Sequence, residues 1–143
     1  MASARAEAEP RPGAPRLLAR AAALRCPQCG RAKMFRTWFA LHRRCAACGL
    51  SFERDEREDY WLGAFLLNFI VTETVFAVLV LVVLVATWPD PAWSLLGWGG
   101  AVQMVATAIL FYPVSKALWL AIDLIFRPAS PADFEDPEAA DTR

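Results

Sequence analysis

Four cysteines form the most specific chemical pattern in the sequence. They stand in the motifs CPQCG and CAACG, fifteen residues apart, and are Cys26, Cys29, Cys45 and Cys48. Two C-x2-C pairs at this spacing are typical of a four-cysteine zinc site. Gly30 and Gly49 follow the pairs, where a residue without a Cβ lets the backbone turn tightly and direct N–H groups at sulfur. Because four thiolates complete a tetrahedron, the pattern predicts a closed, structural zinc site with these four cysteines as ligands.

Other chemistries of the same cysteines remain open. A rubredoxin-like iron site uses similar knuckles, usually with its cysteine pairs farther apart, and would make the chain a membrane-anchored electron carrier. Two disulfides are disfavoured by a reducing cytoplasm. A zinc site that opens on oxidation is chemically allowed, although nothing nearby singles out one reactive thiol. His42 is interpreted as a loop residue, since four sulfurs already fill the coordination sphere.

A second group of polar residues interrupts long apolar segments. These intramembrane polar candidates are Asn68, Glu73, Lys116 and Asp123. A charged group near the centre of a membrane-spanning helix costs roughly 2.5 to 3.5 kcal/mol and therefore calls for a partner. With Asp59 and Arg127 placed at one membrane surface, Glu73 and Lys116 fall within about one helical turn in height, so we expect them to pair across a hairpin. The pair would lock the helices together or, alternatively, serve a proton or ion step. Asp123, four residues from Arg127, is expected at the interface.

Two segments are long and apolar enough to cross a membrane. They are residues 60–88 and 98–126, each 29 residues long, or roughly 43 Å of helix against a hydrocarbon core of roughly 30 Å. The connection, residues 89–97, contains Pro89 and Pro91, which disfavour a continuous helix. The sequence therefore predicts an all-α membrane fold, a two-span transmembrane helical hairpin behind a small zinc-ribbon-like module.

Charge is distributed unequally although the chain is neutral overall. Twelve of the fifteen basic residues precede Trp61, and the connection between the spans has only Asp90. The positive-inside rule then places both termini in the cytoplasm. Residues 10–52 carry nine basic and no acidic residues, a pattern that could bind nucleic acid but that anionic lipids at a membrane surface explain more simply. We expect the partners to be the lipid bilayer and either other membrane subunits or a second copy, because two spans bury little surface against each other.

The remaining segments contain few apolar side chains. Residues 25–59 form the cysteine module and an acidic linker, with too small a core to fold unaided, so metal binding would supply on the order of 10 kcal/mol. The tails, residues 1–24 and 127–143, are expected to be disordered. No nucleophile with a base, glycine-rich phosphate loop or HExxH motif occurs in the sequence, and we therefore expect a non-enzymatic protein.

A family resemblance rests on several stretches of the sequence. CPQCG, Phe35, CAACGLSFER, DYWLGAFLLNFIVTE and FYPVSKALWLAIDLIFRP resemble the bacterial membrane family catalogued as domain-of-unknown-function family 983, over residues 25–128. The resemblance implies a small inner-membrane protein with a cytoplasmic four-cysteine module and no assigned reaction. Because members are often encoded beside respiratory oxidase genes, it also implies an accessory or assembly role. It carries over the four cysteines as ligands and Asn68, Glu73, Pro113 and Asp123 as motif positions. The expected function is an adaptor or accessory subunit of a larger membrane complex.

Overall fold

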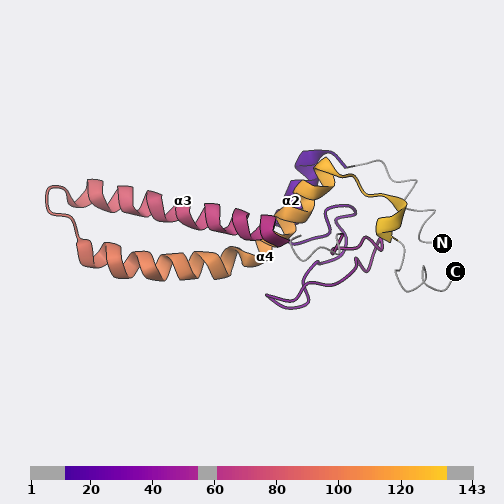
Figure 1. The fold of residues 1–143 in the computed structure, drawn as a ribbon, viewed down its shortest axis with the longest axis horizontal. Coiled ribbons are helices and arrows are strands. Elements are labelled where there is room, and N and C mark those ends of the chain that lie inside the picture. Colours follow the sequence, from indigo (N-terminus) through magenta and orange to yellow (C-terminus); the bar gives the residue numbers. More distant parts are fainter. Residues whose placement is uncertain (1–11, 55–60, 135–143) are drawn as a thin grey trace.

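The computed structural model describes residues 12–54 and 61–134 as an elongated molecule with a helical hairpin at one end and a small head at the other (Figure 1). Its elements are α2 (Ala14–Ala22), α3 (Leu62–Thr87), the short π-helix η2 (Leu95–Gly99), α4 (Gly100–Phe126) and the 3-10 helix η3 (Pro131–Phe134). The head consists of α2, residues 23–54, the last turns of α4 and η3.

The hairpin pairs α3 with α4 in antiparallel orientation, as expected (Figure 1). Glycines allow the two helices to approach closely at both ends of the pair. A Cβ at Gly63 would overlap the ring of Trp119, and one at Gly100 would lie 2.6 Å from Cε2 of Phe76. Bulkier residues at these two positions would force the helices apart.

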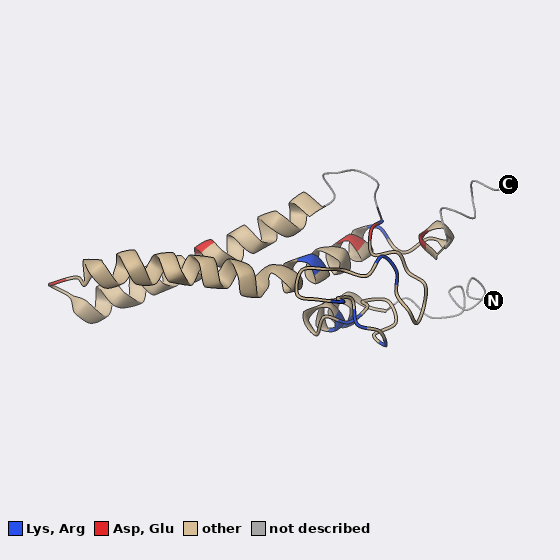
Figure 2. Ribbon diagram, turned by 90° about the horizontal axis from the view of Figure 1, so that it is seen from below, with Lys and Arg blue, Asp and Glu red and all other residues tan. Residues whose placement is uncertain are grey.

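Large apolar side chains on the hairpin face outward instead of forming a core. Phe65 is 68% exposed, Val85 72% and Val102 67%. Both helical segments, Leu62–Thr87 and Leu95–Phe126, are long and apolar enough to cross a membrane. Figure 2 shows that charged residues concentrate around the head and are sparse along the hairpin. The prediction of two long apolar helices is confirmed, and their insertion in a bilayer stays a prediction.

The core of the protein lies in the head, where three parts of the chain meet. Its buried residues are Leu17 and Ala21 of α2, Cys26, Cys29, Met34, Cys45, Leu50 and Phe52 of the cysteine module, and Ala117, Leu120, Ala121 and Leu124 of α4. The last three turns of α4, from Ala117 onward, therefore belong to the head. The cysteine module does not fold around its four cysteines alone, because α2 and α4 supply much of its apolar contact.

The prediction that residues 1–24 are disordered is wrong for residues 14–22, which form α2. Pro15 lies at the first turn, where the missing N–H has no helical partner to lose. Leu17 and Ala21 lie four residues apart, on one helical face, and pack against α4. The Ala-, Pro- and Arg-rich composition of the segment concealed this short apolar stripe. Residues 1–11 lie outside the described residues.

The prediction of a disordered C-terminal tail is likewise wrong for residues 127–134. Within this stretch, η3 places Asp133 against the cysteine module, where the Ser51 N–H donates to the Asp133 carbonyl oxygen at 2.8 Å. Residues 135–143 lie outside the described part of the chain, as do Asp59 and Tyr60.

The cysteine module has knuckles but no strands in residues 12–54. Three isolated bridges hold its turns together: Arg25 with Lys33, Phe35 with Leu41, and Arg44 with Ser51. The zinc-ribbon-like prediction therefore holds for the two cysteine turns. In place of the extended strands of a ribbon, residues 12–54 contain only isolated bridges.

Candidate metal centre

Each cysteine pair forms a tight turn closed by its glycine. The Gly30 N–H donates to the Cys26 carbonyl at 2.8 Å, and the Gly49 N–H donates to the Cys45 carbonyl at 2.9 Å. Both glycines have positive φ, 71° and 82°, a conformation that side-chain-bearing residues adopt only with strain. The two knuckles therefore have the same backbone geometry, as the repeated C-x2-C-G motif predicts.

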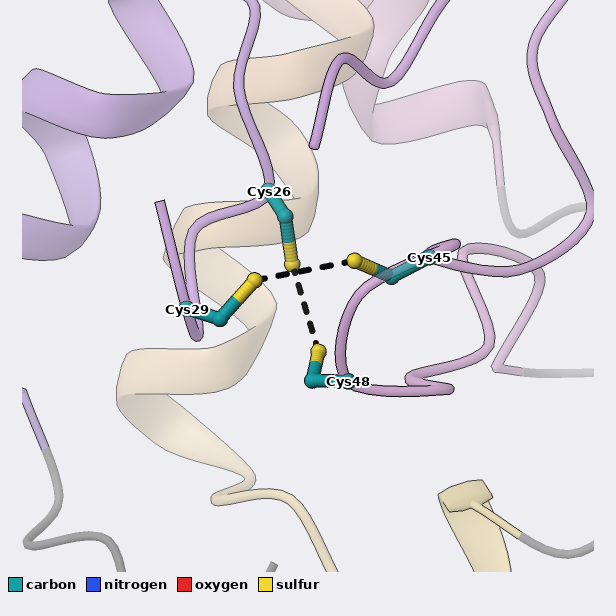
Figure 3. A group of neighbouring side chains, drawn as sticks. All are labelled: Cys26, Cys29, Cys45 and Cys48. Atoms are coloured by element: carbon teal, nitrogen blue, oxygen red, sulfur yellow. Dashed lines mark hydrogen bonds between the residues drawn. The ribbon is translucent and has the colours of Figure 1, made fainter. Parts of the chain in front are cut away.

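The two knuckles bring all four sulfur atoms together (Figure 3). The sulfurs lie within 4.8 Å of one another, with 3.8 Å between Cys26 and Cys48 and 3.6 Å between Cys29 and Cys45. A tetrahedral ion with bonds of about 2.3 Å to sulfur would hold its ligands about 3.8 Å apart. Three of the cysteines are buried, and Cys48 is half-buried. The four cysteines could therefore bind a metal ion.

The electrostatics of the cluster favour a bound cation. Hydrogen bonding with Cys45 and Cys48, together with burial, raises the pKa of Cys26, whereas hydrogen bonding with Cys26 lowers the pKa of Cys45. The pKa of Cys48 is raised to about 12. Hydrogen bonding with Cys26 lowers this pKa, but hydrogen bonding with Cys45 and burial together raise it by a larger amount. Crowded, buried thiols of this kind cannot all ionise without a neutralising charge, which a divalent ion supplies.

The first knuckle is braced by Arg20 of α2. Nη1 of Arg20 donates to the carbonyl oxygens of Pro27 and Gln28 at 3.1 and 2.5 Å. Gly30 also leaves room for this side chain, because a Cβ there would lie 2.8 Å from Nε of Arg20. The composition of residues 1–24 predicts a disordered tail, so Arg20 is not among the residues expected near the cysteines. The apolar spacing of Leu17 and Ala21 is the signal that would have located the helix.

The second knuckle is followed by a buried arginine that ties the module to α4. Nη1 of Arg54 donates to Oδ2 of Asp123 at 2.7 Å, and Nη2 lies 3.1 Å from Oδ2 of Asp133. Asp123 also pairs with Arg127, the residue that follows α4, at 2.7 Å. Although burial alone would raise the pKa of Asp133, the hydrogen bonds from Arg54 and Ser130 lower it overall. The expected intramembrane Asp123 therefore lies in the head, among charged partners.

The turn of the cysteine module that contains Trp38 and Phe39 also contacts α4, farther from the head than the contacts of Asp123. Pro113 has no N–H and so cannot donate to the Ile109 carbonyl, one turn earlier. The indole Nε1 of Trp38 donates to this oxygen at 2.9 Å. The ring of the next residue, Phe39, lies 5.3 Å from that of Tyr112. Trp38 thus supplies the hydrogen bond that the proline removes.

Asn68, Thr72 and Glu73 form a polar stripe within the hairpin. Nδ2 of Asn68 donates to the Ala108 carbonyl at 3.0 Å, and the Thr72 hydroxyl donates to Oδ1 of Asn68 at 3.4 Å. With Met104 of α4 and neighbouring apolar residues, the three line a groove of about 310 Å³. Within residues 12–54 and 61–134, no side chain forms an ion pair or hydrogen bond with the Glu73 carboxylate.

The predicted pairing of Glu73 with Lys116 is wrong. Nζ of Lys116 lies over the rings of Trp61 and Tyr112, at 4.7 and 4.9 Å from their centroids. Glu73 is twelve residues beyond Trp61 on α3, or roughly 18 Å along the helix axis. The predicted pairing assumes that Arg127 lies at the same height as the start of α3. In the structure, α4 continues past the start of α3 and its last turns lie in the head.

The chain matches the model of a known protein family. The model of the family described as "Protein of unknown function (DUF983)" matches residues 35–123. This range includes the second knuckle, α3 and α4 as far as Asp123, and it begins after Cys26 and Cys29. No curated protein and no solved structure matches the chain.

Proposed function

Because this chain belongs to domain-of-unknown-function family 983, we propose its role from geometry: it is a non-enzymatic membrane adaptor with a zinc-bound head fixed to its second span. The observation that carries this proposal is the shared core. Met34, Leu50 and Phe52 of the cysteine module pack in one cluster with Ala117 and Leu120 of α4. Metal binding would therefore organise the head and the end of the span as a single unit.

Zinc is the ion that the proposal assigns to the four cysteines. Four sulfur ligands complete the coordination sphere and leave no position for a substrate, which supports a structural ion. The bound ion would neutralise the thiolates and supply folding free energy to a module whose own apolar core is small. A cytoplasmic partner would then recognise the surface of the ordered head.

The membrane part of the proposal places α3 and α4 across the bacterial inner membrane, with both termini in the cytoplasm. The outward-facing apolar side chains support insertion, and the excess of basic residues before Trp61 supports this orientation. Residues 95–116 would extend about 33 Å, enough for the hydrocarbon core. The exposed face of α3 is then available to subunits of a larger membrane complex, and the family resemblance suggests a respiratory one.

An iron-bound electron carrier is the second candidate, because the donor set is the same and Cys48 is half-buried, closer to the surface than the other three sulfurs. A relay through Glu73 and Lys116 receives no support from their separation along the helices.

One experiment separates these functions. The full chain is purified in mild detergent, and its zinc and iron contents, visible spectrum and co-purifying membrane subunits are measured. A Cys45→Ser/Cys48→Ser variant tests metal dependence, and His42→Ala, an exposed neighbour, is the matched control. The adaptor proposal expects one zinc per chain and partners that the cysteine variant loses but His42→Ala keeps. Iron with visible absorbance would favour the carrier, and partners retained without metal would contradict a metal-organised adaptor.

A further inference from the structure

Residues 36–40, the finger, form a closed turn at the edge of the head. The Arg36 and Thr37 N–H groups donate to the Ala40 carbonyl at 2.8 and 3.3 Å, and the Ala40 N–H donates to the Thr37 hydroxyl at 3.2 Å. Three of its backbone amides are therefore satisfied within the turn. Each amide that is satisfied within the turn lowers the cost of bringing irregular backbone close to an apolar medium.

The finger lies beside α4, on the hairpin side of the level at which the hairpin meets the head. Trp61 and Lys116 mark this level, because a lysine over an aromatic ring at the start of a span is typical of a membrane interface. Phe39 contacts Tyr112, four residues from Lys116, and Trp38 bonds to Ile109, seven residues from it. These separations correspond to roughly 6 and 10 Å along the helix axis.

The outer surface of the finger is aromatic and its surroundings are basic. Trp38 is 47% exposed and Phe39 59% exposed, although each has one contact with α4. Lys33, Arg36 and Arg43 are exposed around the turn, and no acidic residue occurs in residues 10–52. Aromatic rings favour the boundary between headgroups and acyl chains, and each basic residue near an anionic surface contributes about 1 kcal/mol.

We propose that the finger inserts Trp38 and Phe39 into the headgroup–acyl boundary of an anionic leaflet, with Lys33, Arg36 and Arg43 on the lipid phosphates. The metal module then lies against the membrane surface instead of extending into solvent. This inference rests on the proposed membrane position of α3 and α4. It adds that the head is itself a lipid-binding surface, held in place by the bond from Trp38 to Ile109.

The test measures the depth of three phenylalanines by fluorine NMR. 4-Trifluoromethyl-phenylalanine replaces Phe39, Phe69 or Phe134 in the full, metal-loaded chain, in nanodiscs of phosphatidylglycerol and phosphatidylcholine with or without lipid nitroxide-labelled at acyl carbon 5. Phe69 is 52% exposed on α3 and reports span insertion, while Phe134 of η3 reports the side of the head away from the hairpin. We expect a several-fold rise in relaxation rate at Phe39 and Phe69, and little change at Phe134.

The outcomes distinguish the finger from the spans. Relaxation at Phe69 but not at Phe39 would overturn the finger while leaving membrane insertion intact, since the turn would then face water or protein. No relaxation at Phe69 would overturn the membrane position itself. In discs of phosphatidylcholine alone, the rise in relaxation rate at Phe39 should be smaller, while the rise at Phe69 should stay the same. An equal rise at Phe39 in both kinds of disc would overturn the role of the basic residues.

Discussion

Arg54 and Asp123, 69 residues apart in the chain, form a buried ion pair with 2.7 Å between Nη1 and Oδ2. Their side chains are only 6% and 7% exposed. The pair connects the segment after the second knuckle to the last turn of the longest helix. Arg54 also bonds to Asp133 and to the Arg127 carbonyl, so one guanidinium joins three segments of the head.

Replacing Arg54 should destabilise the head more than any exposed arginine does. Arg54→Ala leaves Asp133 without its arginine and Asp123 with Arg127 alone, and breaking a buried pair from one side costs about 3 kcal/mol or more. Arg54→Lys keeps the charge but loses the forked geometry, so its effect should be smaller. Thermal unfolding of the metal-loaded protein measures both. Arg43→Ala, exposed in the same module, is the control, and an equal effect there would contradict the assigned role of Arg54.

Trp38 and Pro113 should be energetically coupled. Trp38→Phe keeps an aromatic ring but removes the donor to the Ile109 carbonyl, which should cost about 1 kcal/mol. Pro113→Ala restores an N–H that can donate to the same oxygen within the helix. In the Pro113→Ala background, Trp38→Phe should therefore cost less than in the wild type. A double-mutant cycle on unfolding free energies measures the coupling, and strictly additive effects would show that the carbonyl does not depend on the indole.

Metal affinity should rise steeply with pH. The pKa values of Cys26 and Cys48 are raised, the latter to about 12, so both thiols hold protons at neutral pH and must release them to become ligands. With two or more protons released, the apparent affinity should increase about 100-fold or more per pH unit near neutrality. Competition with a chelator between pH 6.5 and 8, set as a rough range below the usual cysteine pKa of about 8.5, measures the slope. A pH-independent affinity would exclude thiolate ligation by these residues.

Glu73 and Lys116 should contribute to stability independently. Lys116 lies over Trp61 and Tyr112, whereas Glu73 lines the groove with Asn68 and Thr72. The effects of Glu73→Gln and Lys116→Met on unfolding free energy should therefore add to within about 0.5 kcal/mol in the double variant. Thermal unfolding in nanodiscs provides the comparison. A coupling well above that value would restore the ion pair across the hairpin.

The features predicted correctly are those carried by local patterns. The repeated C-x2-C-G motif specifies both knuckles, and the long apolar segments specify α3 and α4. The register of the hairpin was not predictable in this way, because Ala117, Leu120 and Leu124 are as suitable for a protein core as for a bilayer. Contacts between distant residues were missed for a related reason. Nothing near Trp38 or Arg54 in the sequence indicates a partner 71 or 69 residues away.

Hydrogen–deuterium exchange of the full chain in nanodiscs, before and after chelation, measures whether a bound metal organises the head and the end of α4 as one unit. Removing the metal should increase exchange in the knuckles, in α2 and in residues 117–124 of α4, while α3 keeps its protection. Unchanged protection in residues 117–124 after complete metal removal would show that the metal does not organise the end of α4.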